Sequence, residues 1–394
     1  VLLLWIYESP RDASGSVQTI LPDLLTRATR STPGLAAMAA RCEDLYAADL
    51  RGTSFTIGNR QLTQFAMEFV ADEFVTGKPI FDEAISLLSE VIHAPLMEDG
   101  NFLKEHFDQE RENLVRAIEG LRDDKSGWAQ KQLRQEMFAG TPWERHAWGT
   151  VDEARDLRLS DVADHWKKMT SQSPVRLFLV GNLEEQDALK VSDLLAGSGL
   201  RGPMMSASSP PVDEGGEVKK IEEVDEITQA RLSLGYRLRH DVLPGPMATL
   251  SGLALGGGSH SRLFKRVREA EGLAYSCYAD VQLDSASLTI HAGVDSSSLE
   301  RAQIVIEEEI ARLADSGITA DEFELSKLAL SRQLQAVADS PRGACYFRLV
   351  GHILGRETEP SQVLKEVQSI GPEGLPGILG AARLDTVYSL GQAR

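Results

Sequence analysis

The chain has 394 residues, of which 42% are hydrophobic, so it is long enough to bury two ordinary cores. Its 41 Lys and Arg residues against 59 Asp and Glu residues give a net charge of −18, which repels a polyphosphate backbone and excludes nucleic acid as the expected partner. The cysteines Cys42, Cys277 and Cys345 have no C-x-x-C spacing and predict neither a disulfide framework nor a thiolate metal site.

The chain opens on a short hydrophobic run, VLLLWIYE at residues 1–8, which predicts a strand. The run is too short to span a bilayer and has no basic leader, so we expect no membrane partner. A cytoplasmic location follows as the expectation. The periplasm is the alternative if a segment precedes Val1.

The first half continues with a strand-like run, FTIGNRQLTQFAMEFV, and then two helical patterns joined by a Pro/Gly turn. The first helical pattern begins at residue 81 and places Ile85, Leu88 and Ile92 on one face. Phe102 opens the second pattern, and the short strand-like run VRLFLVG at 175–181 closes this half.

The Gly-, Pro- and Ser-rich stretch at residues 197–217 predicts a linker. After it come the strand-like runs ITQARLSLGYRL, AYSCYADVQ and SLTIHAGV, and two further helical patterns. The first of these helices has Ala302, Val305, Ile306 and Ile310 at helical spacing, Phe323 opens the second, and the run DTVYSLG ends the half.

Because both halves show the same order of elements, the sequence predicts a duplicated α+β architecture. Each half is expected to form a domain in which a mostly antiparallel sheet packs against helices. The predicted domains are residues 1–196 and 218–394, with the linker between them.

The common catalytic motifs are absent from the sequence. No two of the eight histidines are three or four residues apart, which excludes H-E-x-x-H and H-x-x-E-H zinc helices. No G-x-S-x-G motif occurs either. The acids Glu110, Glu112, Asp123 and Asp124 are interpreted as a solvated helix face rather than a general acid and base, since the chain is rich in acids.

The stretch GGGSHSRLFKRVREAEGLAYS at residues 256–276 lacks the Gly-Lys-Ser/Thr of a phosphate loop. We expect its glycines to reverse the chain between two helices and to let another backbone approach closely. Ser259 or Ser261 then caps a helix, whose Leu263, Phe264 and Val267 pack inward. A glycine at 272 ends this helix.

Arg268 on this helix and Tyr275 on the next strand are then expected on either side of one tight reversal. A guanidinium and a phenol held close together can both donate hydrogen bonds to a peptide carbonyl or a developing oxyanion. The alternative is that Arg268 pairs with Glu269 or Glu271 and Tyr275 simply packs.

At these residues the sequence resembles the pitrilysin/insulinase family of zinc peptidases, also called inverzincins. The family's second domain carries a similar run: a glycine-rich turn, S-R-L-F, x-x-V-R-E and then G-L-A-Y. In the first half, WIYESPRDASG, LLTRAT and FLVGN are similar to the family's opening strand and turn, its Lys-Gly-Thr segment and its closing strand. The resemblance implies a half clam-shell of two homologous domains.

The sequence departs from the family where the catalytic members carry H-x-x-E-H. Aligning RAT at residues 27–29 with the family's Lys-Gly-Thr segment places Thr19 and Asp23 at the histidine positions and Pro22 at the general base. The third ligand, a Glu, falls at Ala117, with Glu119 two residues further on. These residue types cannot replace the originals, so the resemblance implies no zinc and no catalytic residue in this chain.

The resemblance therefore implies a non-catalytic, substrate-gripping subunit of a heteromeric zinc metalloendopeptidase that cleaves peptides or unfolded segments. A homologous partner supplies the zinc, and the chain is inactive alone. Arg268 and Tyr275 match the family's substrate-binding Arg/Tyr pair, including its seven-residue separation. One alternative is a structural or peptide-binding scaffold without a role in catalysis; another is an active peptidase with an unrecognised metal site.

Overall fold

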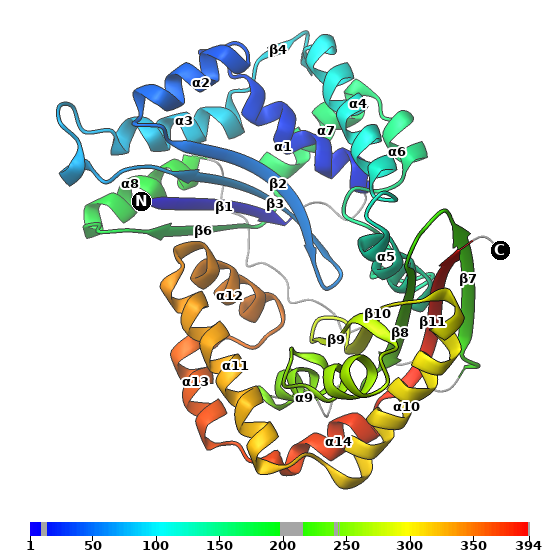
Figure 1. Ribbon diagram of the computed structural model, residues 1–394. Helices are drawn as coiled ribbons and strands as arrows, with labels where there is room; N and C mark the ends of the chain where they lie inside the picture. Colours follow the sequence, from blue (N-terminus) through cyan, green and yellow to red (C-terminus); the bar gives the residue numbers. More distant parts are fainter. Residues whose placement is uncertain (9–13, 198–215, 240–242, 244, 393–394) are drawn as a thin grey trace. The chain divides into compact units, whose positions relative to one another are not determined.

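A computed structural model describes residues 1–8, 14–197, 216–239, 243 and 245–392 (Figure 1). The family-like turn predicted at residues 9–13 and most of the predicted linker lie outside the described residues. The chain divides into two compact units, which are Val1–Gly120 with His146–Ser206 and Leu121–Arg145 with Ala207–Arg394.

The first unit is built on a sheet with the strand order β2-β3-β1-β6, in which every pair is antiparallel. Its elements in chain order are β1 (Leu2–Glu8), α1 (Gly15–Arg27), α2 (Leu35–Asp44), β2 (Asp49–Ile57), β3 (Arg60–Glu68), η1 (Asp72–Phe74), α3 (Phe81–His93), β4 (Met97–Glu98), β5 (Asn101–Phe102), α4 (Lys104–Gly120), α6 (Val151–Arg155), α7 (Leu159–Gln172), β6 (Val175–Val180) and α8 (Glu185–Gly197).

The hydrophobic run at the start of the chain forms the interior strand β1. All seven of its residues are buried, because β3 and β6 pair on its two sides and neither face is open to solvent. The predicted helical face of Ile85, Leu88 and Ile92 is likewise buried on α3.

The second unit has a sheet with the order β7-β11-β8-β10-β9, which is antiparallel except where β7 meets β11. Its elements are α5 (Lys125–Met137), β7 (Lys219–Asp225), β8 (Ala230–Arg237), α9 (Met247–Gly256), η3 (Phe264–Ala270), β9 (Ala274–Gln282), β10 (Ser287–Val294), η4 (Ser296–Ser298), α10 (Leu299–Ser316), α11 (Ala320–Asp339), α12 (Pro341–Ile353), α13 (Pro360–Ser369), η5 (Pro372–Gly374), α14 (Leu375–Gly380) and β11 (Arg383–Gln392).

The two units repeat one topology. The order β9-β10-β8-β11 in the second sheet reproduces β2-β3-β1-β6 in the first, and in both cases the strands occur at the same points of the chain order. Strand β7 is the addition to the second sheet. The predicted α+β fold with two similar, mostly antiparallel halves is confirmed.

Helix α5 is the clearest difference from the sequence-based division. It lies in the first half of the sequence, yet its Ala129 and Leu133 pack with Tyr388 and Leu390 of β11 in the second unit. Gly235 of β8 provides the room, because a Cβ there would lie 3.3 Å from the Leu133 side chain. Residues 1–196 and 218–394 remain the proposed halves of the duplication, while 121–145 belong to the second compact unit.

Alternate residues of β8 and β11 show which sheet face α5 covers. Leu232 and Leu234 join the main core of the second unit with Val387, whereas Tyr388 and Leu390 join the small cluster under α5. Because successive residues of a strand point to opposite faces, α5 lies on the face away from the main core.

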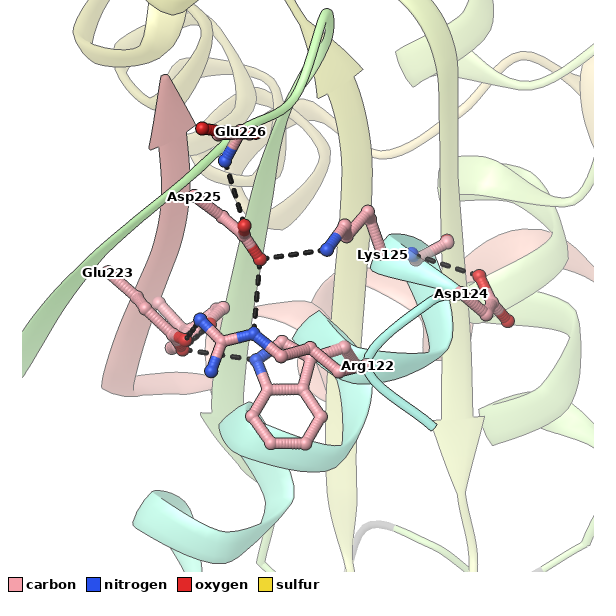
Figure 2. Close-up of polar contacts among 9 residues, drawn as sticks. Arg122, Asp124, Lys125, Glu223, Asp225 and Glu226 are labelled. Atoms are coloured by element: carbon pink, nitrogen blue, oxygen red, sulfur yellow. Dashed lines mark hydrogen bonds and ion pairs between the residues drawn. The ribbon is translucent and has the colours of Figure 1, made fainter. Parts of the chain in front are cut away.

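A polar network fastens β7 to the N-terminal end of α5 (Figure 2). Lys125 donates to Asp225 at 2.8 Å, and Arg122 pairs with both Asp225 and Glu223. The Trp128 ring donates from Nε1 to Glu223 Oε2 at 3.1 Å. The sequence did not predict β7, because its side chains alternate between exposed and half-buried without a regular apolar face.

Among the described residues, no helix is both long and apolar enough to cross a membrane. The cytoplasmic location stays a prediction from the sequence.

Candidate functional site

The glycine run lets α9 approach β9 closely. A Cβ on Gly256 would overlap the backbone nitrogen of Ala279 and lie 2.9 Å from its Cα. Gly258 then has φ +146°, a conformation that side chains rarely allow, where the chain leaves α9. The predicted role of the glycines in a chain reversal and a close backbone approach is confirmed.

The segment after the glycines is a π-helix, η3, rather than the expected α-helix. Leu263 and Val267 are buried as predicted, and Phe264 is half-buried. Ser261 does not form the predicted cap, because its Oγ donates to the Gly258 carbonyl at 2.6 Å. The alternative cap, Ser259, stays a prediction. The helix ends at the predicted glycine, which has φ +62°. π-Helical turns are rare and concentrate at functional sites.

Three basic side chains in and just before η3 are neutralised by carboxylates. Arg262 pairs with Glu322 at 2.9 Å, and Lys265 reaches the same carboxylate at 3.4 Å. Arg266 pairs with Glu271 at 3.0 Å. These ion pairs join η3 to neighbouring residues of the second unit and neutralise the three basic side chains.

Arg268 differs from these three residues. It is exposed, and its guanidinium lies over the Phe264 ring at 4.8 Å from the centroid. The expected alternative, a pair with Glu269 or Glu271, is not formed: Glu271 instead pairs with Arg266 and Arg301. Within the described part of the chain, Arg268 has no ion pair, so its charge is available to a ligand.

Tyr275 lies at a β-bulge in the edge strand β9. The pairing with β10 shifts between Gly293 and Val294, which leaves Tyr275 as the extra residue on its strand. Bulges re-aim side chains and are frequent beside active sites. The Tyr275 side chain is 62% exposed, and its hydroxyl donates to Asp295 Oδ1 at 3.3 Å.

The reversal at residue 272 joins η3 directly to β9, so Arg268 and Tyr275 lie on adjoining elements of one unit. No contact between the two side chains is recorded within the described residues. Both side chains are exposed, and Arg268 can donate to an acceptor that comes from outside the chain. Tyr275 can do so once its hydroxyl turns away from Asp295.

The residues aligned with the family's zinc motif, Thr19, Pro22 and Asp23, lie on α1 in the first unit. Thr19 Oγ1 donates to the Ala147 carbonyl at 3.0 Å, so its hydroxyl has a structural partner. Pro22 is buried, and its carbonyl accepts from Thr26 Oγ1 at 2.9 Å. Gly52 of β2 lies beneath it, because a Cβ there would be 2.7 Å from the Pro22 Cβ. These contacts hold α1 against β2.

Asp23 is the one carboxylate among these α1 positions. Its surface is exposed, yet the protein around the carboxyl and the nearby Glu110 raise its pKa to about 6. Glu110 itself forms an ion pair with Arg27, and both side chains are nearly buried. Glu110 therefore does not belong to a solvated helix face as expected from the sequence, whereas Glu112 is exposed.

Ala117 lies exposed on α4, and the nearby Glu119 pairs with Arg155 at 2.6 Å. Within the residues that the structure describes, no group of three or more His, Cys, Asp or Glu side chains is placed to hold a metal ion. Arg268 and Tyr275 belong to the second compact unit, whereas the α1 and α4 positions belong to the first.

Comparison with known proteins shows which family this chain resembles. A family model described as "Peptidase M16 inactive domain" matches residues 156–330. The "Probable inactive metalloprotease YmfF" of Bacillus subtilis is 22% identical over 376 residues, which cover 95% of this chain and 88% of that protein. Over residues 156–330 the chain is similar to the M16 peptidase family. The resemblance to the pitrilysin-type zinc peptidases is thereby confirmed.

Solved structures share the fold. A conserved protein from Enterococcus faecalis V583 superposes with a TM-score of 0.90 at 20% identity and covers 100% of this chain and 93% of that one. The peptidase M16 inactive domain from Pseudomonas fluorescens superposes with a TM-score of 0.80 at 16% identity, again over 100% and 93%. The chain spans about half of several other curated relatives, between 47% and 56% of their length.

Active M16 peptidases would be expected to hold zinc at the α1 and α4 positions, and the side chains here do not fit that metal. Thr19 is a poor ligand with its hydroxyl engaged, Pro22 and Ala117 have no donor atom, and Asp23 alone makes no site. The chain is similar to inactive M16 peptidase-like domains.

Proposed function

We propose that the chain is the non-catalytic, substrate-gripping subunit of a heteromeric zinc metalloendopeptidase that acts on peptides or unfolded segments. Arg268 and Tyr275 donate hydrogen bonds to a backbone carbonyl of the bound peptide and orient it. A homologous M16 subunit carrying H-x-x-E-H supplies the zinc and the general base. The chain alone neither binds catalytic zinc nor cleaves peptides.

The free charge of Arg268 is the observation that carries this proposal. Of the four basic side chains between residues 262 and 268, three are paired with carboxylates, and Arg268 alone has no carboxylate partner among the residues that the structure describes. A structural role for η3 explains the three ion pairs. It gives no reason for a fourth cation that contacts only an aromatic ring.

The edge strand β9 supports a peptide-binding role. An edge strand has one row of backbone N–H and C=O groups without a strand partner, and an extended peptide can pair with it. Tyr275 stands at the start of this strand, and Tyr278 on the same strand is 37% exposed. A peptide along β9 would therefore run directly past the Tyr275 hydroxyl.

Reconstitution with the zinc-bearing subunit tests the proposal. Zinc content and peptide cleavage are measured for the chain alone and for its mixture with an H-x-x-E-H-bearing M16 subunit from the same source. We expect both only in the mixture. Arg268→Ala or Tyr275→Phe should lower kcat of the mixture about 10²-fold, the scale for losing one preorganised donor to the reacting carbonyl.

Lys265→Ala is the matched control, because it removes a positive charge from the same π-helix but one that is paired with Glu322. It should leave the rate of the mixture nearly unchanged. If Arg268→Ala and Tyr275→Phe also leave it unchanged while the complex still forms, the chain is a structural scaffold. Zinc and activity in the chain alone would instead show that the assignment of Thr19, Pro22 and Asp23 is wrong.

A further inference from the structure

A small polar pocket lies in the second unit between α5 and the sheet. It has a volume of about 10 Å³, which is room for one water-sized group. Its lining comes from α5, β8, β9 and β10, and the polar members are Ser126, Arg231, Ser233, Ser276, Tyr278 and His291. Ser276 and Tyr278 are exposed while Ser233 and His291 are buried, so the pocket leads from the edge strand to a buried floor.

The pocket holds a guanidinium with an unused donor. Arg231 donates from Nη1 to the Gln229 side chain, but its buried Nε has no hydrogen-bond partner within the described residues. A buried, unpaired N–H of this kind costs free energy unless a ligand or water accepts from it.

The floor is completed by a buried histidine. Ser233 Oγ lies 2.8 Å from His291 Nδ1, and burial lowers the pKa of His291 to about 4. The ring is therefore neutral near neutral pH. When Ser233 donates to Nδ1, the ring proton resides on Nε2 and gives the pocket a further donor.

Gly293 of β10 is needed for space rather than for backbone conformation. A Cβ there would overlap Arg231 Nη1 and lie 3.0 Å from Ser276 Oγ. Any larger residue at this position would displace the guanidinium or close the pocket. The sequence thus leaves room for Arg231 and Ser276 to face the same space.

The charge of the lining is unusual for this chain. The protein carries 59 acidic residues, yet no carboxylate lines the pocket, and Arg231 is its one charged side chain at neutral pH. Hydroxyls, an imidazole and a guanidinium are groups that donate to an oxyanion. The volume admits one terminal oxygen of such a ligand.

We propose that this pocket is a carboxylate-binding site that receives an acidic side chain of a peptide lying along β9. Ser276 and Tyr278 belong to β9 itself, and Ser276 directly follows Tyr275. A peptide held at Tyr275 would therefore place a neighbouring side chain at the mouth of the pocket. This part of the proposal rests on the peptide-binding function above, whereas carboxylate binding by the pocket does not.

Acetate and acetamide are the probes for the pocket alone, because they match in shape and differ in charge. Binding to the full chain is followed by the NMR signals of the His291 ring. Acetate should shift these signals saturably and raise the His291 pKa from about 4, since a bound anion favours the imidazolium, and acetamide should do neither. Arg231→Gln should weaken acetate binding about tenfold or more through the lost charge-assisted hydrogen bond.

Lys220→Gln is the charge-matched control, since Lys220 is an exposed residue on β7 of the same sheet that does not line the pocket. It should bind acetate as the unaltered chain does. Gly293→Ala provides a second test that keeps every charge and should also abolish binding. The site is disproved if acetamide acts like acetate, or if Arg231→Gln binds acetate as strongly as Lys220→Gln.

Two end-capped peptides that differ by one Asp or Asn distinguish the source of the carboxylate. The Asp peptide should bind the chain about tenfold more tightly than the Asn peptide, and Arg231→Gln should remove this preference. If acetate binds but the Asp peptide has no advantage, the pocket takes a free small carboxylate and the peptide part is wrong. Tyr275→Phe separates that failure from failure of the proposed function, because it removes the proposed peptide contact and leaves acetate binding intact.

Discussion

Arg268 and Tyr275 each occupy a departure from regular secondary structure. Arg268 lies on a π-helix, and Tyr275 is the extra residue of a β-bulge. Both features turn a side chain away from the direction that a regular helix or strand would give it. Both features interrupt regular backbone hydrogen bonding, which is common where a side chain contacts a ligand.

Asp23 gives a prediction at the scale of one residue. Its folded-state pKa of about 6 lies above the ordinary value of 3.8, so the folded chain binds more protons than the unfolded chain between these values. The free energy of unfolding should therefore fall as pH rises through that window. Asp23→Asn should raise the melting temperature by about 1–3 °C near pH 7, a small effect because the side chain is exposed.

Below about pH 3 the Asp23→Asn variant and the unaltered chain should melt together, because the carboxyl is then mostly protonated in both states. Asp123→Asn is the control, as Asp123 is also exposed. Thermal melts followed by circular dichroism over a series of pH values measure the effect. An equal difference at every pH would show that ionisation of the Asp23 carboxyl is not its cause.

The sequence could single out candidate site residues only where a motif was continuous. Arg268 and Tyr275 fall within one stretch of the chain, so the helix, the glycine and the following strand could be placed from the sequence alone. The pocket residues Arg231, Ser276 and His291 come from three strands, and no local pattern relates them. In the sequence, Gly293 was the available sign of this pocket, but its role becomes clear only when the atoms that a Cβ would meet are known.

At the scale of elements, helices and strands with a buried apolar face were predictable, including α3, α10 and β1. The π-helix was not, because the same apolar spacing suits an α-helix, and only backbone bonds that span five residues, such as Glu271 N to the Arg266 carbonyl, distinguish the two. The packing of α5 on the second sheet could not be predicted from the sequence either. Its hydrophobic residues require a partner surface, but amphipathicity does not say which of two similar sheets provides it.

A buried ion pair anchors the C-terminal end of α5 to the second sheet. Arg237 on β8 pairs with Asp385 on β11 at 3.1 Å, with only 14% and 7% of the two side chains exposed. The same guanidinium donates to the Met137 carbonyl at the end of α5 and stacks over Phe138 at 4.3 Å. Arg237 therefore joins two strands and α5.

Arg237→Ala should destabilise the protein by about 3 kcal/mol, because it leaves the Asp385 carboxylate buried without its partner. Chemical denaturation followed by circular dichroism measures this loss. Arg122→Ala, which breaks the more exposed network at the other end of α5, should cost much less. Equal losses for the two variants would contradict the assignment of Arg237 as the main polar anchor.

At the scale of the whole molecule, the duplication and the compact units divide the chain differently. The repeat of β-strand order argues for two halves separated near the linker, yet residues 121–145 complete the second unit. A gene-level duplication and a folding unit are separate properties. An element can pack on the other copy's sheet when the two copies are joined in one chain and present similar surfaces.

This interleaving predicts that residues 216–394 alone do not form a stable unit. Without 121–145, the cluster of Ile227, Tyr388 and Leu390 loses the cover of Ala129 and Leu133, and Arg237 loses the Met137 carbonyl. Leaving large apolar side chains in water forfeits about 1.5–3 kcal/mol each, which is a substantial share of the stability of one domain. The fragment should aggregate or be cleaved rapidly in limited proteolysis.

The matched fragment joins residues 121–145 through a flexible Gly/Ser linker to 216–394, which restores α5 without the rest of the first unit. It should be soluble, resist proteolysis and melt cooperatively, because every contact described for α5 lies within this set of residues. If the shorter fragment folds equally well, α5 is dispensable to the second sheet. The duplication would then coincide with the folding units, and the pocket at Arg231 could form without Ser126.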